Sequence, residues 1–143
     1  MARIGILTCA NATQELGCSS VVCLADLRKR RGFFAAYPAG EPLDLVGIMS
    51  CPGCPTICGF DKLLHRVQGL TAFKVDAIHL STCMKHLCPF QEKYQAVLAE
   101  TYPGLVIVPG THTEHLEAQQ FRKLVQGLFA QTRRTMIDVI TGS

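Results

Sequence analysis

Four short apolar runs, separated by stretches of helical periodicity, constrain the fold more than any other feature of this sequence. They lie at residues 3–8, 43–50, 76–82 and 105–109, and Ile, Val and Leu dominate each of them. Short continuous apolar runs are typical of strands that are covered on both faces, as in a parallel sheet. We therefore predict four buried strands in a mainly parallel sheet.

Helical patterns are predicted between these runs, at about residues 20–31, 60–67 and 90–100. In the first of them Val21, Leu24 and Leu27 fall on one face, and Gly32 just beyond four basic residues is an ordinary C-terminal signal. A longer helical segment is predicted at about residues 113–141, with a weak point at Gly127 that predicts two helices as the alternative. Its apolar face is expected to cover the core, and a homodimer contact is the alternative use of that face.

Strands that alternate with helices predict an α/β fold with right-handed crossovers. The specific expectation is a three-layer sandwich whose four-stranded sheet has the order 2-1-3-4 and is flanked by helices. A chain of 143 residues with 48% hydrophobic residues is long enough to bury one core. We therefore expect residues 1–143 to form a single domain.

Charge and hydropathy exclude several classes of function. A net charge of +3 is too small to predict nucleic-acid binding. No apolar run approaches the ~18–20 residues that span a bilayer, so no membrane partner is expected. The first nine residues lack the features of a secretory signal peptide, and no glycine-rich phosphate loop is present. The expected location is the cytoplasm, where thiols stay reduced.

The positions of the eight cysteines are the strongest functional signal. Cysteines follow the first three predicted strands, and histidines follow the fourth. In chain order these residues are Cys9, Cys18, Cys23, Cys51, Cys54, Cys58, Cys83, Cys88, His112 and His115. The carboxyl ends of parallel strands meet at one edge of a sheet, where α/β proteins bind ligands. The sequence therefore predicts that these side chains gather at one edge.

Thiolates and imidazoles are the ligands of Zn²⁺, and thiolates also hold iron–sulfur clusters. Two cysteine pairs on neighbouring loops can supply four sulfurs, so the predicted core ligands are Cys51, Cys54, Cys83 and Cys88. Supporting ligands are expected among Cys9, Cys18, Cys23 and His112. Zinc is favoured over an iron–sulfur cluster, and the metal ion is the expected partner. The sequence leaves open whether such a site is structural, catalytic or redox-active.

The main alternative is a thiol–disulfide enzyme or carrier that uses the pair Cys51 and Cys54, whose spacing after a strand also suits redox chemistry. Cysteine also occurs as a small buried apolar residue, and this is the favoured interpretation of Cys58. His79, in the middle of the third predicted strand, is expected to be a hydrogen-bonded core residue. For His86, a metal ligand and an exposed loop residue remain equally open.

Five short motifs together resemble the CGGC-domain family over about residues 3–112. They are Ile4-Gly5-Ile6 leading to Cys9, the segment 46–55 around Cys51-Pro52-Gly53-Cys54, Ser81-Thr82-Cys83, Cys88-Pro89-Phe90 and Gly110-Thr111-His112. The pair Cys18 and Cys23, which follows the first motif, is also part of the resemblance. The resemblance implies metal binding, commonly of zinc. Pro52 departs from the family motif, because it replaces the first glycine and removes one N–H donor from the loop.

Overall fold

The computed structural model describes residues 1–54, 60–130 and 140–142. Its sheet has four strands, which are β1 (Ala2–Thr8), β2 (Leu43–Ser50), β3 (Ala77–Leu80) and β4 (Val106–Pro109). All neighbouring strands pair in parallel, in the order β2-β1-β3-β4. The predicted α/β class and strand order are therefore confirmed.

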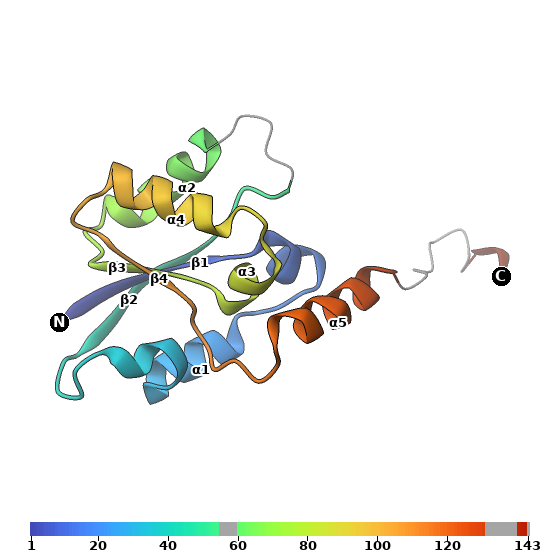
Figure 1. Ribbon diagram of the computed structural model, residues 1–143, viewed down its shortest axis with the longest axis horizontal. Helices are drawn as coiled ribbons and strands as arrows, with labels where there is room; N and C mark the ends of the chain where they lie inside the picture. Colours follow the sequence, from blue (N-terminus) through green and yellow to red (C-terminus); the bar gives the residue numbers. More distant parts are fainter. Residues whose placement is uncertain (55–59, 131–139, 143) are drawn as a thin grey trace.

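Helices cover both faces of this sheet (Figure 1). The α-helices are α1 (Val21–Lys29), α2 (Asp61–Thr71), α3 (Thr82–Leu87), α4 (Gln91–Thr101) and α5 (Ala118–Ala130). Two five-residue helical turns follow β1 and α1, namely η1 (Asn11–Glu15) and η2 (Gly32–Ala36). Figure 1 shows α2 and α4 over one face of the sheet, α1 over the other, and α5 extending away from the body.

β1 lies at the centre of the sheet and divides the core into two halves. Leu7 packs on the face that α2 and α4 cover, whereas Ile4 and Ile6 pack on the face below α1, and all three side chains are fully buried. Gly5 lets α2 approach closely, because a Cβ there would lie 2.9 Å from Leu70 Cδ1. The alternation of residues along one strand thus joins the two outer layers.

Helix α3 was not predicted, and the third strand is shorter than expected. The predicted strand extends to residue 82, but β3 ends at Leu80 because Ser81 caps a helix that begins at Thr82. The Ser81 hydroxyl accepts a hydrogen bond from the Met84 N–H, as the first residue of a helix commonly does. His86 therefore lies on a helix and not in a loop.

The last helical segment also differs from the prediction. Its helix begins at Ala118 and not at residue 113, because the Asp26 carboxylate accepts hydrogen bonds from the N–H and hydroxyl of Thr113 and holds that segment against α1. Gly127 does not interrupt α5. Leu124 is 62% exposed, and Leu128 and Phe129 are also exposed, so this part of the apolar face does not cover the core. Residues 131–139 lie outside the described part, and the homodimer stays a prediction.

His79 is the hydrogen-bonded core histidine that the sequence predicts. It is fully buried in β3, and its Nδ1 lies 2.8 Å from the Gly110 carbonyl oxygen while its Nε2 lies 2.8 Å from the Tyr37 hydroxyl. Burial lowers its pKa, so the ring is neutral and links β3 to η2 and to the end of β4. Over the described ranges, no helix has the length and apolar character needed to cross a membrane.

Replacing Ile6 by Ala should lower the free energy of unfolding by about 2–5 kcal/mol, because the side chain is fully buried and its loss leaves a cavity. Ile48 is the matched control, since it pairs with Ile6 across β1 and β2 but is 40% exposed. Urea unfolding of the two alanine variants measures the difference. A loss at Ile48 as large as that at Ile6 would contradict this division of the core.

Candidate functional site

Three loops leave the sheet side by side at its carboxyl edge. The backbone N–H of Cys51 donates to the Thr8 carbonyl oxygen at 2.8 Å, and that of Ser81 donates to the Leu7 carbonyl oxygen at 2.9 Å. These bonds continue the strand pairing one residue beyond the strands. Cys9 and Cys51 therefore begin neighbouring loops, and Cys83 lies beside them in the first turn of α3, at the edge that the parallel sheet predicts.

Cys9 and Cys83 are the most closely coupled of these residues. The Cys83 thiol donates a hydrogen bond to the Cys9 sulfur, which lowers the pKa of Cys9 to about 6 despite its burial. Smaller contributions to this lower pKa come from the N–H groups of Ala12 and Asn11. The same hydrogen bond and burial raise the pKa of Cys83. The interaction therefore favours the thiolate form at Cys9 and the thiol form at Cys83.

Cys51 brings a third sulfur to this edge. Its Sγ accepts a hydrogen bond from the Ala10 N–H at 3.4 Å, one residue beyond Cys9. Cys9 and Cys51 are both buried in the core cluster below α2 and α4, and the partly buried Cys83 and Cys88 pack against that cluster. The four cysteines Cys9, Cys51, Cys83 and Cys88 thus lie around the ends of β1, β2 and β3. Cys54, which interacts electrostatically with Cys51 and Cys9, is the fifth member of what we call the thiol cluster.

The other two members of the thiol cluster have raised pKa values. Burial is the main cause at Cys88, where the pKa rises to about 11, and the nearby Cys54, Cys51 and Cys9 raise it further. Cys54 is exposed, and burial of part of its surface together with Cys51 and Cys9 raises its pKa. Each thiol that ionises therefore makes the next ionisation harder, and a cation would relieve this repulsion.

Cys18 and Cys23 form a separate group beside the thiol cluster. The Cys23 sulfur lies 3.1 Å from the Thr111 hydroxyl, and burial raises its pKa. Cys18 is exposed, and its sulfur accepts a hydrogen bond from the Ser20 N–H. A pocket of about 210 Å³ lies between the two groups, and Cys18, Cys23, Cys83 and His112 line it.

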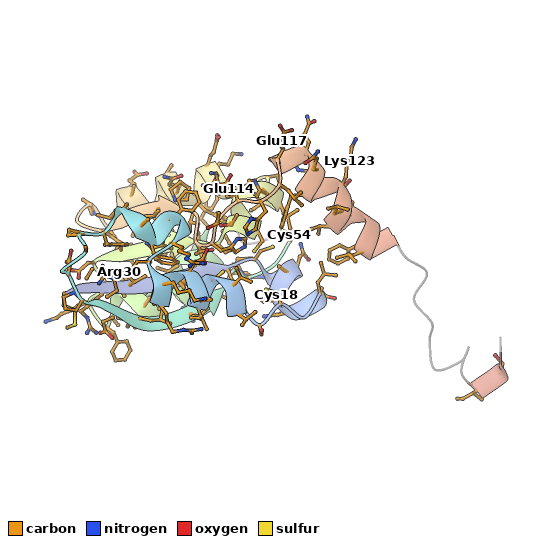
Figure 2. The ribbon with its side chains drawn as sticks, turned by 90° about the horizontal axis from the view of Figure 1, so that it is seen from below. Cys18, Arg30, Cys54, Glu114, Glu117 and Lys123 are labelled. Carbon is orange, nitrogen blue, oxygen red and sulfur yellow. The ribbon has the colours of Figure 1, made fainter. Side chains whose placement is uncertain are left out.

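The predicted site residues therefore lie at one end of the molecule. Figure 2 shows Cys18 and Cys54 toward the end from which α5 extends, whereas Arg30 lies at the opposite end. An apolar hollow of about 470 Å³ elsewhere on the sheet has neither cysteine nor histidine in its lining. Cys58 lies outside the described residues. Metal ligation by the predicted set stays a prediction, because in the described part of the chain no three His, Cys, Asp or Glu side chains stand ready to hold one ion.

Two buried hydroxyl residues support the site but were not predicted to do so. Ser81 Oγ lies 3.0 Å from the Cys83 sulfur. Thr111 contacts Cys23 and also accepts a hydrogen bond from the Thr82 N–H at 3.2 Å, which joins the end of β4 to the start of α3. Both residues stand in motifs that carry the family resemblance, next to Cys83 and His112. Their position in those motifs is the sequence signal that could have identified them as residues of the site.

Comparison with known proteins identifies one family. The family model described as the CGGC domain matches residues 3–112, a range that contains every cysteine of the chain. No curated protein and no solved structure matches the chain.

The hydrogen bond from Cys83 to Cys9 predicts an unusually reactive Cys9 in the reduced, metal-free protein. Its alkylation should reach half of its maximal rate near pH 6, and Cys83→Ala should move this midpoint upward because burial of Cys9 then acts without its main hydrogen-bond donor. Mass spectrometry of the Cys9 peptide across a pH series measures both midpoints.

Cys23→Ala is the control for this experiment, since Cys23 is also buried but does not contribute to the lowered pKa of Cys9. If the midpoint for Cys9 is the same in Cys83→Ala as in the wild type, the hydrogen bond from Cys83 does not lower the pKa of Cys9. The folded pKa lies below the ordinary 9.0. The thiolate therefore stabilises the fold above pH 9, and this contribution is lost as the pH falls through about 6.

Proposed function

The chain belongs to the CGGC domain family, and on that premise we propose that it binds a metal ion or cluster through its thiol cluster. One observation carries the proposal, namely that cysteines after β1, β2 and β3 lie at one edge of the sheet and that one of them, Cys9, favours the thiolate form. Metals bind the deprotonated thiol. A reducing cytoplasm, the location that we propose, would keep these sulfurs free for that purpose.

The proposed core ligands are Cys51, Cys54, Cys83 and Cys88, and the contact with Cys83 adds Cys9 to this set. Cys18, Cys23 and His112 remain supporting candidates, because they line the pocket that reaches Cys83. Zinc is favoured over an iron–sulfur cluster, since the donors available at this edge combine thiolates with an imidazole. Bound zinc would supply a structural link in a closed four-ligand site, or Lewis acidity where one position stays open.

The chain's own residues prepare the thiol cluster for a cation. The N–H groups of Ala10, Asn11 and Ala12 donate hydrogen bonds to the sulfurs of Cys51 and Cys9, so the loop after β1 favours negative charge before any ion arrives. The Cys83 proton is the one that ligation must release. The Ser81 hydroxyl, whose Oγ lies 3.0 Å from the Cys83 sulfur, can donate a hydrogen bond to the thiolate that remains. Backbone and hydroxyl groups of this kind orient ligands and adjust their basicity.

Elemental analysis with an absorption spectrum, on protein purified without oxygen, tests the proposal. Colourless protein that contains about one or two equivalents of zinc is the expected result, where the range follows from four sulfurs per tetrahedral ion. Brown protein with iron and sulfide would support the cluster alternative. Reduced, folded protein with neither metal would contradict metal binding.

Cys54→Ser should sharply lower the metal content, while the secondary structure should stay unchanged because Cys54 is exposed. Cys58→Ser is the matched control, four residues further along the sequence, and it should keep nearly all of the metal. Metal content per folded protein, measured after identical purification, separates the two variants. Equal losses would contradict our assignment of ligands in this loop.

Thiol–disulfide exchange is the second candidate, and the coupling of Cys9 with Cys83 favours it. A thiolate beside a thiol is the state from which an external disulfide is attacked. In that reaction Cys9 would bond to one sulfur of the external disulfide and release the other as a thiolate. Cys83 would then close a disulfide with Cys9, and the second external thiol would leave. The raised pKa of Cys54 makes the pair Cys51 and Cys54 a weaker choice.

Peptide mapping of the metal-free protein after treatment with oxidised glutathione distinguishes the two functions. Redox chemistry predicts a Cys9–Cys83 disulfide. This disulfide should form at the same rate in protein that never held zinc and in protein from which bound zinc has been removed. A chain that forms only mixed disulfides with glutathione would contradict the redox candidate.

A further inference from the structure

His86 has a buried ring nitrogen that nothing in the thiol cluster explains. The side chain is only 6% exposed, and among the described residues its Nε2 has no hydrogen-bond partner. Buried polar atoms are nearly always paired, so such an atom requires an explanation. A neutral imidazole has a lone pair on whichever nitrogen lacks the proton, and that lone pair can bind a cation.

Glu114 faces this nitrogen at a distance that suits a shared ion. Its Oε2 lies 3.7 Å from His86 Nε2, which is too long for a hydrogen bond. Two ligands at about 2.0–2.1 Å from a tetrahedral Zn²⁺ lie roughly 3.3–3.4 Å apart. Lys85 Nζ holds the other oxygen, Oε1, at 2.6 Å and so directs Oε2 toward His86.

His112 supplies a third donor on the same pocket. Its Nδ1 lies 3.0 Å from the Thr113 carbonyl oxygen. A proton on Nδ1 would donate to that oxygen and leave the lone pair on Nε2, which is the arrangement that metal-binding histidines commonly show. A pocket of about 110 Å³ has His86, His112, Glu114 and His115 in its lining.

From these contacts we propose that His86 and Glu114, with His112 as third donor, form a second divalent-cation site of imidazole–carboxylate type that contains none of the thiol cluster. His112 lines the pockets of both sites, so occupation of this site withdraws it from the supporting ligands of the thiol cluster. Among the described residues these three side chains do not yet stand close enough to hold one ion. Closing the site therefore requires Glu114 and His112 to approach His86, in the case of Glu114 by a few tenths of an ångström from 3.7 Å. His115, which is exposed, or water would complete the coordination. Neutral imidazoles and a carboxylate select ions such as Zn²⁺ and Co²⁺ over thiophilic Cu(I).

The surrounding charges set the expected strength of this site. Lys85 pairs with Glu114, and Arg122 donates to the His86 carbonyl oxygen at 3.0 Å, so two positive side chains lie close by. Both repel a cation. The site should therefore bind more weakly than the thiol cluster and fill after it.

A Co²⁺ titration of the full chain, followed by absorption, tests the site. Cobalt held by thiolates gives intense near-ultraviolet charge-transfer bands, whereas cobalt held by imidazole and carboxylate gives only weak visible bands. The wild-type chain should show both components. Glu114→Gln and His86→Gln should each weaken the sulfur-free component by about tenfold or more, by analogy with the losses seen when groups around a metal are changed.

Two variants serve as controls. His65→Gln removes an exposed histidine on α2 and should leave the sulfur-free component unchanged. Cys54→Ser should weaken only the charge-transfer component, so failure of the thiol proposal and failure of this site are distinguishable. Glu114 is on the surface and its variant should fold even if that of His86 does not. Three results would overturn the proposal. The sulfur-free cobalt absorption could be absent from the wild type, it could persist in Glu114→Gln, or it could fall by the same amount in His65→Gln.

Discussion

The parallel pairing of β1 with both β2 and β3 is the constraint on which the rest of the molecule depends. It points the carboxyl ends of the strands to one edge, and the strand pairing continues one residue further through the Cys51 and Ser81 N–H groups. Residues that stand far apart in the chain therefore begin adjacent loops. An antiparallel partner for β1 would move Cys51 or Cys83 to the opposite edge, and the sulfurs could not meet.

Once the sulfurs are close, their ionisation is no longer independent. Cys9 keeps a low pKa because Cys83 and the loop N–H groups donate to it, while the pKa values of Cys83, Cys88 and Cys54 are raised. The metal-free thiol cluster can thus hold little negative charge. A divalent cation changes that balance, since it replaces several protons at once. This competition between protons and metal is the physical basis of the function that we propose.

The strands, their order and the edge at which the cysteines gather follow from sequence, because apolar periodicity and the geometry of parallel crossovers are local or topological rules. Other features depend on individual tertiary contacts. The hydrogen bond at Ser81 starts α3 where the sequence predicts the end of a strand. The contacts of Asp26 with Thr113 hold residue 113 outside the last helix, which begins at Ala118. The roles of Ser81 and Thr111 could not be predicted from spacing, because they arise from which loops lie opposite each other. His86 belongs to the same group, since its burial depends on α3 and α5.

Zinc-edge X-ray absorption on the purified full chain tests the central claim most directly, because it counts the atoms that surround the metal. Our account predicts a shell dominated by sulfur at about 2.3 Å, the usual zinc–thiolate distance. A shell that contains only nitrogen and oxygen near 2.0–2.1 Å, the range of imidazole and carboxylate ligands, would contradict the thiol cluster as the metal centre.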